Sequence, residues 1–314
     1  MLASSVNRAR SERNASARSL QIAVCLQAFV HSIPIIVNRK AGQAAAADGV
    51  RQALPDAEWL EGDDPRELAQ RALEDRPPVL VAAGGDGTIS AVADVARGTG
   101  TALGVLPVGT LNHFARDLGI PLDPAEAARV IAQGKTATVD LGEVNGRCFV
   151  NNASLGLYAG IVRERERQQR RLRRSKRAAM LWATLAVLNR PPLLELRLHT
   201  AEGERDCAAP FVFIGNNEYE LEGFDIGRRA RLDAGALGVY TTRPCGAGGL
   251  AMLALRALLG RLRQADDFIE SPAERLRVVS RKRQLLVATD GEVTRMATPL
   301  EFRILPRALK VVVP

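Results

Sequence analysis

The sequence is poor in the residues that build zinc sites. It has four cysteines and three histidines in 314 residues, and no two cysteines form a Cys-x-x-Cys pair. Structural zinc sites draw on closely spaced cysteine and histidine pairs. The composition therefore argues against a zinc site and is typical of a protein from a reducing compartment.

Long apolar runs are also missing. Residues 20–37 are largely apolar, but polar residues and a proline interrupt them at positions 21, 27, 31, 32 and 34. A membrane-spanning helix needs about 20 consecutive apolar residues, so neither such a helix nor a signal peptide is predicted. Residues 1–30, rich in Ser, Arg and Ala, are expected to be a disordered leader. Their composition also resembles a transit peptide, and a start codon placed too far upstream would give the same appearance.

Nearly all of the excess positive charge lies in one segment of the chain. The net charge is +8, and residues 163–177 alone hold nine basic and two acidic residues. The rest of the chain has 34 basic and 33 acidic residues. A chain whose body is close to neutral lacks a general nucleic-acid footprint, so no nucleic-acid partner is predicted.

The first half of the chain repeats a strand, a glycine loop and a helix. Residues 79–83 form a short apolar run typical of a buried parallel strand. Apolar residues at positions 89, 92, 93 and 96 then follow the spacing of one helix face. Similar units cover residues 33–42 and 102–116. Three such loops would meet at the carboxyl edge of one parallel sheet, where α/β folds bind ligands.

The loop at residues 84–88 has the sequence GGDGT. Glycines allow a ligand to approach the backbone, and the start of a helix favours an anion such as phosphate. Asp86 would repel a phosphate unless a cation or ordered water lay between them, so it suggests a divalent metal ion. The alternative is an ordinary tight turn with an Asx cap.

After residue 144 the pattern changes to short, partly alternating runs. They cover residues 149–155, 193–199, 211–215, 238–242, 276–279, 284–288 and 299–304. Such runs predict an all-β second domain, interrupted by helical segments at residues 161–188 and 247–265. The pattern therefore predicts an α/β domain with a parallel sheet, followed by an all-β domain with helical insertions.

Three motifs in order resemble the diacylglycerol kinase catalytic-domain family, which includes bacterial lipid kinases and the sphingosine and ceramide kinases. They are GGDGT at 84–88, LGVLPVGTLNHFARDLGIP at 103–121 and DGE at 290–292. GGDGT alone is shared with NAD kinases and phosphofructokinases, but the other two are more specific. The resemblance covers about residues 33–314. It implies a Rossmann-like α/β domain at 31–140 that binds the nucleotide and a β-sandwich domain with helical insertions at 141–304 that binds the lipid substrate. A last strand near 305–314 would return to the first domain.

The resemblance also implies transfer of the ATP γ-phosphate to a lipid hydroxyl, with Mg²⁺ as the metal ion. Glu292 is carried over as the general base, and Asp290 and Asp86 as further catalytic residues. For Asp290, Gly291 and Glu292 the alternative is a hairpin turn with Glu292 solvated. The implied nucleotide contacts are Asn38, Gly42, Gly84, Gly85, Asp86, Gly87, Thr88, Gly109, Thr110 and Asn112.

Several residues depart from the family pattern. Ser90 and Ala91 replace the Asn-Glu pair that often follows GGDGT-Ile. His113 replaces the usual Asp after Thr-x-Asn, and is expected to be a capped or solvated loop residue. Ala234 replaces the second of two aspartates, the one linked to a structural Mg²⁺ in bacterial members. Asp86 and Asp233 remain as candidate metal ligands.

Residues 163–177 have two interpretations. They could form a solvated charged helix whose apolar continuation packs on the sandwich, or contact an anionic membrane surface. Residues 247–265 are expected to be an ordinary amphipathic helix rather than a membrane contact. We therefore predict a cytoplasmic lipid kinase of phospholipid metabolism that associates peripherally with membranes. The alternatives are a soluble-metabolite kinase of the NAD kinase type and a nucleotide-binding regulator with little turnover.

Overall fold

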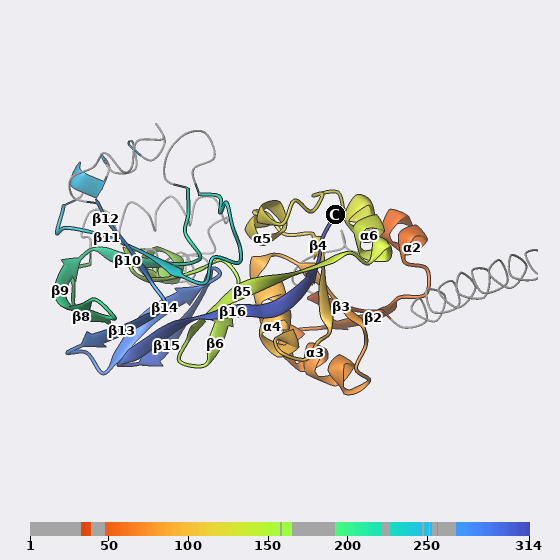
Figure 1. The fold of residues 1–314 in the computed structure, drawn as a ribbon, viewed down its shortest axis with the longest axis horizontal. Helices are drawn as coiled ribbons and strands as arrows, with labels where there is room; N and C mark the ends of the chain where they lie inside the picture. Colours follow the sequence, from red (N-terminus) through yellow and green to blue (C-terminus); the bar gives the residue numbers. More distant parts are fainter. Residues whose placement is uncertain are drawn as a thin grey trace, which may run out of the picture.

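The computed structural model describes two lobes that share one long sheet (Figure 1). The described residues are 33–38, 48–157, 159–164, 192–220, 227–246, 248–250, 252, 256 and 268–314. The predicted leader at 1–30 lies outside them, as does most of the two helical segments expected at 161–188 and 247–265. Within the described part of the chain, no helix is both long and apolar enough to cross a membrane.

The first lobe is built on four parallel strands in the order β2-β1-β3-β4. They are β1 (Pro34–Asn38), β2 (Glu58–Gly62), β3 (Val79–Gly84) and β4 (Ala102–Pro107). All six residues of β4 and the last five of β3 are buried. Burial on both faces explains why these strands are continuously apolar.

Helices within the described residues accompany this sheet (Figure 1). They are α2 (Asp48–Ala53), α3 (Pro65–Glu74), α4 (Asp86–Ala96), α5 (His113–Asp117) and α6 (Pro124–Gln133). Both α3 and α6 begin at an Asp-Pro pair, and the aspartate side chain accepts two backbone N–H groups of the first turn in α3 and one in α6. The helical starts are therefore determined locally.

Two long strands carry the sheet from one lobe to the other (Figure 1). They are β5 (Thr136–Val144) and β16 (Leu300–Val312), which pair antiparallel along most of their length. The end of β16 pairs parallel with β4 through Val311 and Leu103, and its start pairs antiparallel with β13. The last strand of the chain thus belongs to both lobes.

The second lobe is a sandwich of the far part of this sheet and a separate six-stranded sheet. The far part contains β6 (Arg147–Phe149), β8 (Leu194–Thr200), β9 (Gly203–Ala209) and β13 (Arg275–Ser280). The six-stranded sheet contains β7 (Asn152–Gly156), β10 (Phe211–Asn216), β11 (Leu237–Thr242), β12 (Phe268–Ala273), β14 (Gln284–Thr289) and β15 (Glu292–Ala297). Apolar residues of both sheets form one buried core. The predicted fold class is confirmed.

The structure differs from the sequence prediction at the sheet edges and at one strand. The strand expected at 149–155 is broken at Val150 and Asn151, where β6 ends in one sheet before β7 begins in the other. Strands β9, β12 and β15 were not predicted, and each lies at an edge of its sheet. Edge strands expose polar and charged residues, which weakens the apolar alternation that identifies a strand.

Candidate active site

The GGDGT loop lies where β3 passes into α4. Gly84 ends the strand, Gly85 is the residue before the helix and Asp86 is its first residue. The first N–H groups of a helix have no partner within it, and the helix dipole adds partial positive charge there. Thr88 is buried and packs over Gly84, where an added Cβ atom would lie 2.5 Å from its side chain. The turn therefore offers a backbone surface suited to an anion.

The second glycine loop touches the first. A Cβ atom on Gly109 would lie only 2.4 Å from the Cα atom of Gly85, so only glycine allows this approach. Asn112 shapes the loop from inside: its Oδ1 accepts the N–H of Gly109 at 3.0 Å, and its Nδ2 donates to the carbonyl groups of Pro107 and Gly109. Thr110 is exposed at the tip. Two of the predicted nucleotide loops thus form one continuous surface.

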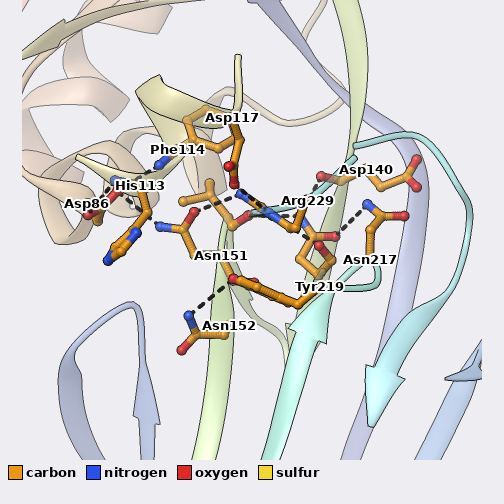
Figure 2. A network of polar contacts seen from close by, with 12 residues as sticks. Asp86, His113, Phe114, Asp117, Asp140, Asn151, Asn152, Asn217, Tyr219 and Arg229 are labelled. Atoms are coloured by element: carbon orange, nitrogen blue, oxygen red, sulfur yellow. Dashed lines mark hydrogen bonds and ion pairs between the residues drawn. The ribbon is translucent and has the colours of Figure 1, made fainter. Parts of the chain in front are cut away.

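Asp86 connects the two loops through hydrogen bonds. Its Oδ2 accepts the backbone N–H of His113 at 3.2 Å, and its Oδ1 accepts that of Phe114 at 3.1 Å (Figure 2). Oδ1 also accepts Nδ2 of Asn151 at 3.0 Å. Any metal ion at Asp86 would have to compete with these donors. His113 is exposed, as expected of a solvated residue, but it is the first residue of α5 rather than a loop residue, and it contributes its backbone N–H here.

Asp290 and Gly291 form the turn between β14 and β15. Both have positive φ angles, 47° and 86°, as a tight hairpin requires, so the hairpin turn that the alternative interpretation described is present, while the role of Glu292 stays a prediction. The Asp290 carboxylate points inward and accepts the backbone N–H groups of Val150, Asn151 and Asn152 at 2.8 to 3.1 Å. Burial raises the pKa of Asp290, and hydrogen bonds from Ser90 and these N–H groups oppose the shift. Asp290 thus holds the segment between β6 and β7.

Glu292 follows this turn and faces the glycine loop. Its Oε2 accepts a hydrogen bond from Nη2 of Arg147 at 2.7 Å. Its Oε1 points toward α4, because a Cβ atom on Gly87 would lie 3.2 Å from it. The side chain is 59% exposed. One oxygen is therefore anchored, and the other faces the turn that is suited to an anion.

A pocket of about 620 Å³ lies between the lobes at this point. It is lined by Asn38, Asp63, Asp64, Pro65, Arg66, Gly87, Thr88, Ala91, Asp94, Asn145, Gly146, Arg147 and Glu292. The pocket brings together the end of β1, the start of α4 and Glu292 of the DGE motif. Of the other predicted site residues, Gly42 lies outside the described residues.

Comparisons with known proteins identify the family. The model of the diacylglycerol kinase catalytic domain matches residues 32–144, and that of the YegS C-terminal NAD kinase beta sandwich-like domain matches residues 154–313. A Pseudomonas aeruginosa protein named "Probable lipid kinase YegS-like" is 32% identical over 282 residues, which are 88% of this chain and 89% of that protein. The chain belongs to the diacylglycerol kinase family.

Further relatives agree with this placement. A Staphylococcus epidermidis diacylglycerol kinase is 44% identical over 90 residues, which are 28% of each chain. A crystal structure of a diacylglycerol kinase from Bacillus anthracis has the same fold, with a TM-score of 0.64 at 20% identity over 90% of this chain and 97% of that one. Homologues in this family are named lipid kinases, so the chain is a kinase of a lipid kinase family.

A row of charged side chains starts in the wall of the pocket, at Arg66 and Asp94. Arg66 and Arg97 both pair with Asp94, and Arg97 also donates to Oε2 of Glu143 at 2.8 Å. Arg303 donates to Oε1 of Glu143 at 2.7 Å. Burial alone would raise the pKa of Glu143, but the hydrogen bonds from Arg303 and Arg97 outweigh it, so this pKa lies below its ordinary value. This row ties α3 and α4 to β5 and β16.

The residues around Ala234 do not fit the structural metal ion that the family pattern implies. Ala234 has no donor oxygen in its side chain, and its N–H donates to Oδ1 of Asn217 at 3.0 Å. Asp233 is paired with Arg231 at 3.1 Å and is 41% exposed. Both carboxylate oxygens of Asp140 accept backbone N–H groups, from Gly235 and Arg307. The described residues contain no group of three or more His, Cys, Asp or Glu side chains able to hold a metal ion.

Three residues of the site were missed by the sequence reasoning: Arg147, Asn151 and Arg229. Arg147 follows Asn145 and Gly146, which have φ angles of 48° and 84° in the turn between β5 and β6. An Asn-Gly pair between two strands is a strong hairpin signal and could have located this turn. Asn151 and Arg229 carry no local signal, because their partners are distant in sequence.

Proposed function

We propose that the protein is an ATP- and Mg²⁺-dependent kinase that transfers the γ-phosphate to a hydroxyl group of a lipid, at or near a membrane surface. The observation that carries the proposal is the approach of Glu292 to the glycine turn. Oε1 of Glu292 lies beside Gly87 in the wall of the pocket, while Oε2 is held by Arg147. An acceptor hydroxyl that enters the pocket next to Oε1 would be close to both a base and a phosphate.

The nucleotide would bind with its phosphates against the start of α4. Gly85, Gly87 and the adjoining loop at Gly109 present backbone there, and Asn38 lines the same pocket. N–H groups at a helix start stabilise phosphate charge without reorganising during the reaction. We assign Asp86 a positioning role, since its carboxylate already accepts three N–H groups. Mg²⁺, which is commonly held largely by nucleotide phosphates and water, would neutralise charge on them.

Glu292 would act as the general base. As the acceptor oxygen bonds to the γ-phosphorus, its proton passes to Oε1 of Glu292 and the bond from phosphorus to the ADP oxygen breaks. A base held within reach of the hydroxyl contributes about 10²- to 10⁴-fold to such a reaction. Arg147 supports this geometry because its contact with Oε2 orients the carboxylate.

The direct test is to incubate the protein with labelled ATP, Mg²⁺ and a total lipid extract, and to identify the labelled product. A labelled lipid supports the proposal. A parallel reaction with NAD as acceptor tests the soluble-metabolite alternative. Thermal stabilisation by Mg-ATP with no transfer to either acceptor would instead indicate a nucleotide-binding regulator and would overturn the proposal.

A further inference from the structure

Arg229 is a buried cation at the junction of the two lobes. Its side chain is 0% exposed, and no other Lys or Arg among the described residues is buried to this degree. Nε donates to Oδ2 of Asp117 at 2.8 Å, and Asp117 is itself only 4% exposed. The guanidinium also lies over the ring of Tyr219, 5.6 Å from its centroid. A buried charge of this kind is tolerated only when it is fully paired.

The other partners of Arg229 come from different parts of the fold. Nη1 donates to the carbonyl groups of Val150 at 2.7 Å and Asn216 at 3.0 Å, and Nη2 donates to Oδ1 of Asn151 at 2.8 Å. Asp117 ends α5 in the first lobe, and Asn216 ends β10 in the sandwich. Val150 and Asn151 lie between the two sheets. One planar group therefore contacts both lobes and the segment that joins the two sheets of the sandwich.

Asn151 extends this junction to the active site (Figure 2). Its Nδ2 donates to Oδ1 of Asp86, the residue that ties the two glycine loops together. Its backbone N–H donates to Asp290, and its carbonyl accepts the hydroxyl of Tyr219 at 3.2 Å. The amide orientation is determined, because rotation by 180° would place donors against Arg229 and an acceptor against Asp86. The side chain of Asn151 thus links the guanidinium of Arg229 to Asp86 in the GGDGT turn.

The same network contains the positions at which this chain departs from its family. His113 and Ala234 both stand where the family has aspartates, and the donors near Ala234 do not fit a metal ion. The network also continues to that region, since Nδ2 of Asn216 donates to the carbonyl of Asp140 at 2.9 Å. Within this network the carboxylates of Asp86, Asp140 and Asp290 accept N–H groups, whereas Asp117 pairs directly with a cation, which Arg229 supplies.

We propose that Arg229 is a positioning residue that replaces the structural metal ion of the family. It locks the two lobes together and, through Asn151 and Asp86, sets the geometry of the glycine turn. The effect on catalysis rests on the proposed function, whereas the effects on metal dependence and amide exchange do not. A guanidinium with fixed, directional donors is suited to this task in a way that a lysine ammonium is not.

The first test measures whether a divalent ion stabilises the folded protein. The melting temperature of the nucleotide-free protein is measured with EDTA and with millimolar Mg²⁺, Ca²⁺ or Mn²⁺. We expect differences of no more than about 1 °C, because a ligand that does not bind the folded state does not stabilise it. Saturable stabilisation by several degrees, lost in EDTA, would overturn the replacement of the metal ion.

The second test separates positioning from stability. Arg229→Met should lower the melting temperature because it leaves Asp117 buried and unpaired, whereas Arg229→Met/Asp117→Leu should regain most of it. In the double variant we expect phosphoryl transfer to stay reduced by at least about tenfold in kcat, since the reacting groups are misplaced. The control is Arg231→Met, which removes an exposed arginine two residues away. Recovery of kcat together with stability would overturn the positioning role.

Amide hydrogen exchange provides a readout that does not depend on turnover. The N–H groups of His113 and Phe114 are bonded to Asp86, so they should exchange faster in the double variant than in the wild type or in Arg231→Met. Unchanged protection of these two groups would contradict the coupling. If the wild type phosphorylates no lipid, this measurement and the metal titration still decide the inference.

Discussion

The approach of the two glycine loops gives a prediction that can be worked out from the structure. In Gly109→Ala the new Cβ atom would lie 2.4 Å from the Cα atom of Gly85 and 2.7 Å from Oδ1 of Asn112. Ordinary contacts begin near 3.4 Å, so the loops must separate by roughly 1 Å, the difference between these distances. The obstacle is backbone, which cannot move aside as a flexible side chain can.

Gly109→Ala is expected to lower both the stability of the protein and its activity. Overpacking of this kind destabilises a protein by about 1–3 kcal/mol, which corresponds to a fall in melting temperature of roughly 2–12 °C for a domain of this size. A displacement of about 1 Å at a reacting centre can also lower the rate about 10²-fold. Both quantities are measurable, by thermal unfolding and by steady-state kinetics with varied ATP concentration.

Two glycines provide controls for this prediction. An alanine at Gly246 meets no atom within 4 Å, so Gly246→Ala should leave stability and activity unchanged. In Gly85→Ala the Cβ atom lies 3.4 Å from the Cα atom of Gly109, so its stability loss should be smaller than that of Gly109→Ala. A Gly109→Ala protein as stable and as active as Gly246→Ala would refute the reasoning.

Two further predictions concern charge. Glu143→Gln removes the negative charge and one of the two oxygens that accept from Arg97 and Arg303, and should cost about 1–3 kcal/mol at neutral pH. Because the folded-state pKa of Glu143 is lowered, its contribution is present above the unfolded value of about 4.3 and is lost as pH falls through the folded value. Thermal unfolding from pH 3 to pH 7 should therefore show the two proteins converging in acid. Separately, neutralising five arginines within residues 163–177 should weaken binding to anionic vesicles and remove its salt dependence, as measured by vesicle sedimentation.

One specific result would contradict each of these two predictions about charge. A wild type and Glu143→Gln pair that differ by the same amount at pH 3 and pH 7 would show that the carboxylate contributes nothing through its charge. Unchanged vesicle binding after the arginines are neutralised would leave residues 163–177 as a solvated charged segment.

The sequence predicted those parts of the site that depend on local signals. Gly84 to Thr88 and the Asp290-Gly291 turn are short patterns whose geometry is set by neighbouring residues, and the pocket is lined by Gly87 and Thr88 of the first and by Glu292, which follows the second. Arg229 and Asp117 are 112 positions apart, and nothing in either segment indicates that they meet. Only the three-dimensional arrangement of the two lobes determines such pairs.

The edge strands show a second limit. In β9 the first four residues are exposed, and no residue of β15 is buried, so neither has the apolar alternation of a half-buried strand. Their pairing comes from neighbours in the sheet rather than from their own apolar residues. The inner strand β3, in contrast, is apolar throughout, and its predicted range of 79–83 ends one residue before the strand does.

The central claim is that Glu292 takes the proton of the acceptor hydroxyl. Glu292→Gln preserves the shape of the side chain but cannot act as a base at neutral pH. We expect it to lower the rate of phosphoryl transfer about 10²- to 10⁴-fold while thermal stabilisation by Mg-ATP stays unchanged. Glu204→Gln, at an exposed position on β9, should transfer phosphate at the wild-type rate. Transfer by Glu292→Gln at the wild-type rate would contradict the account.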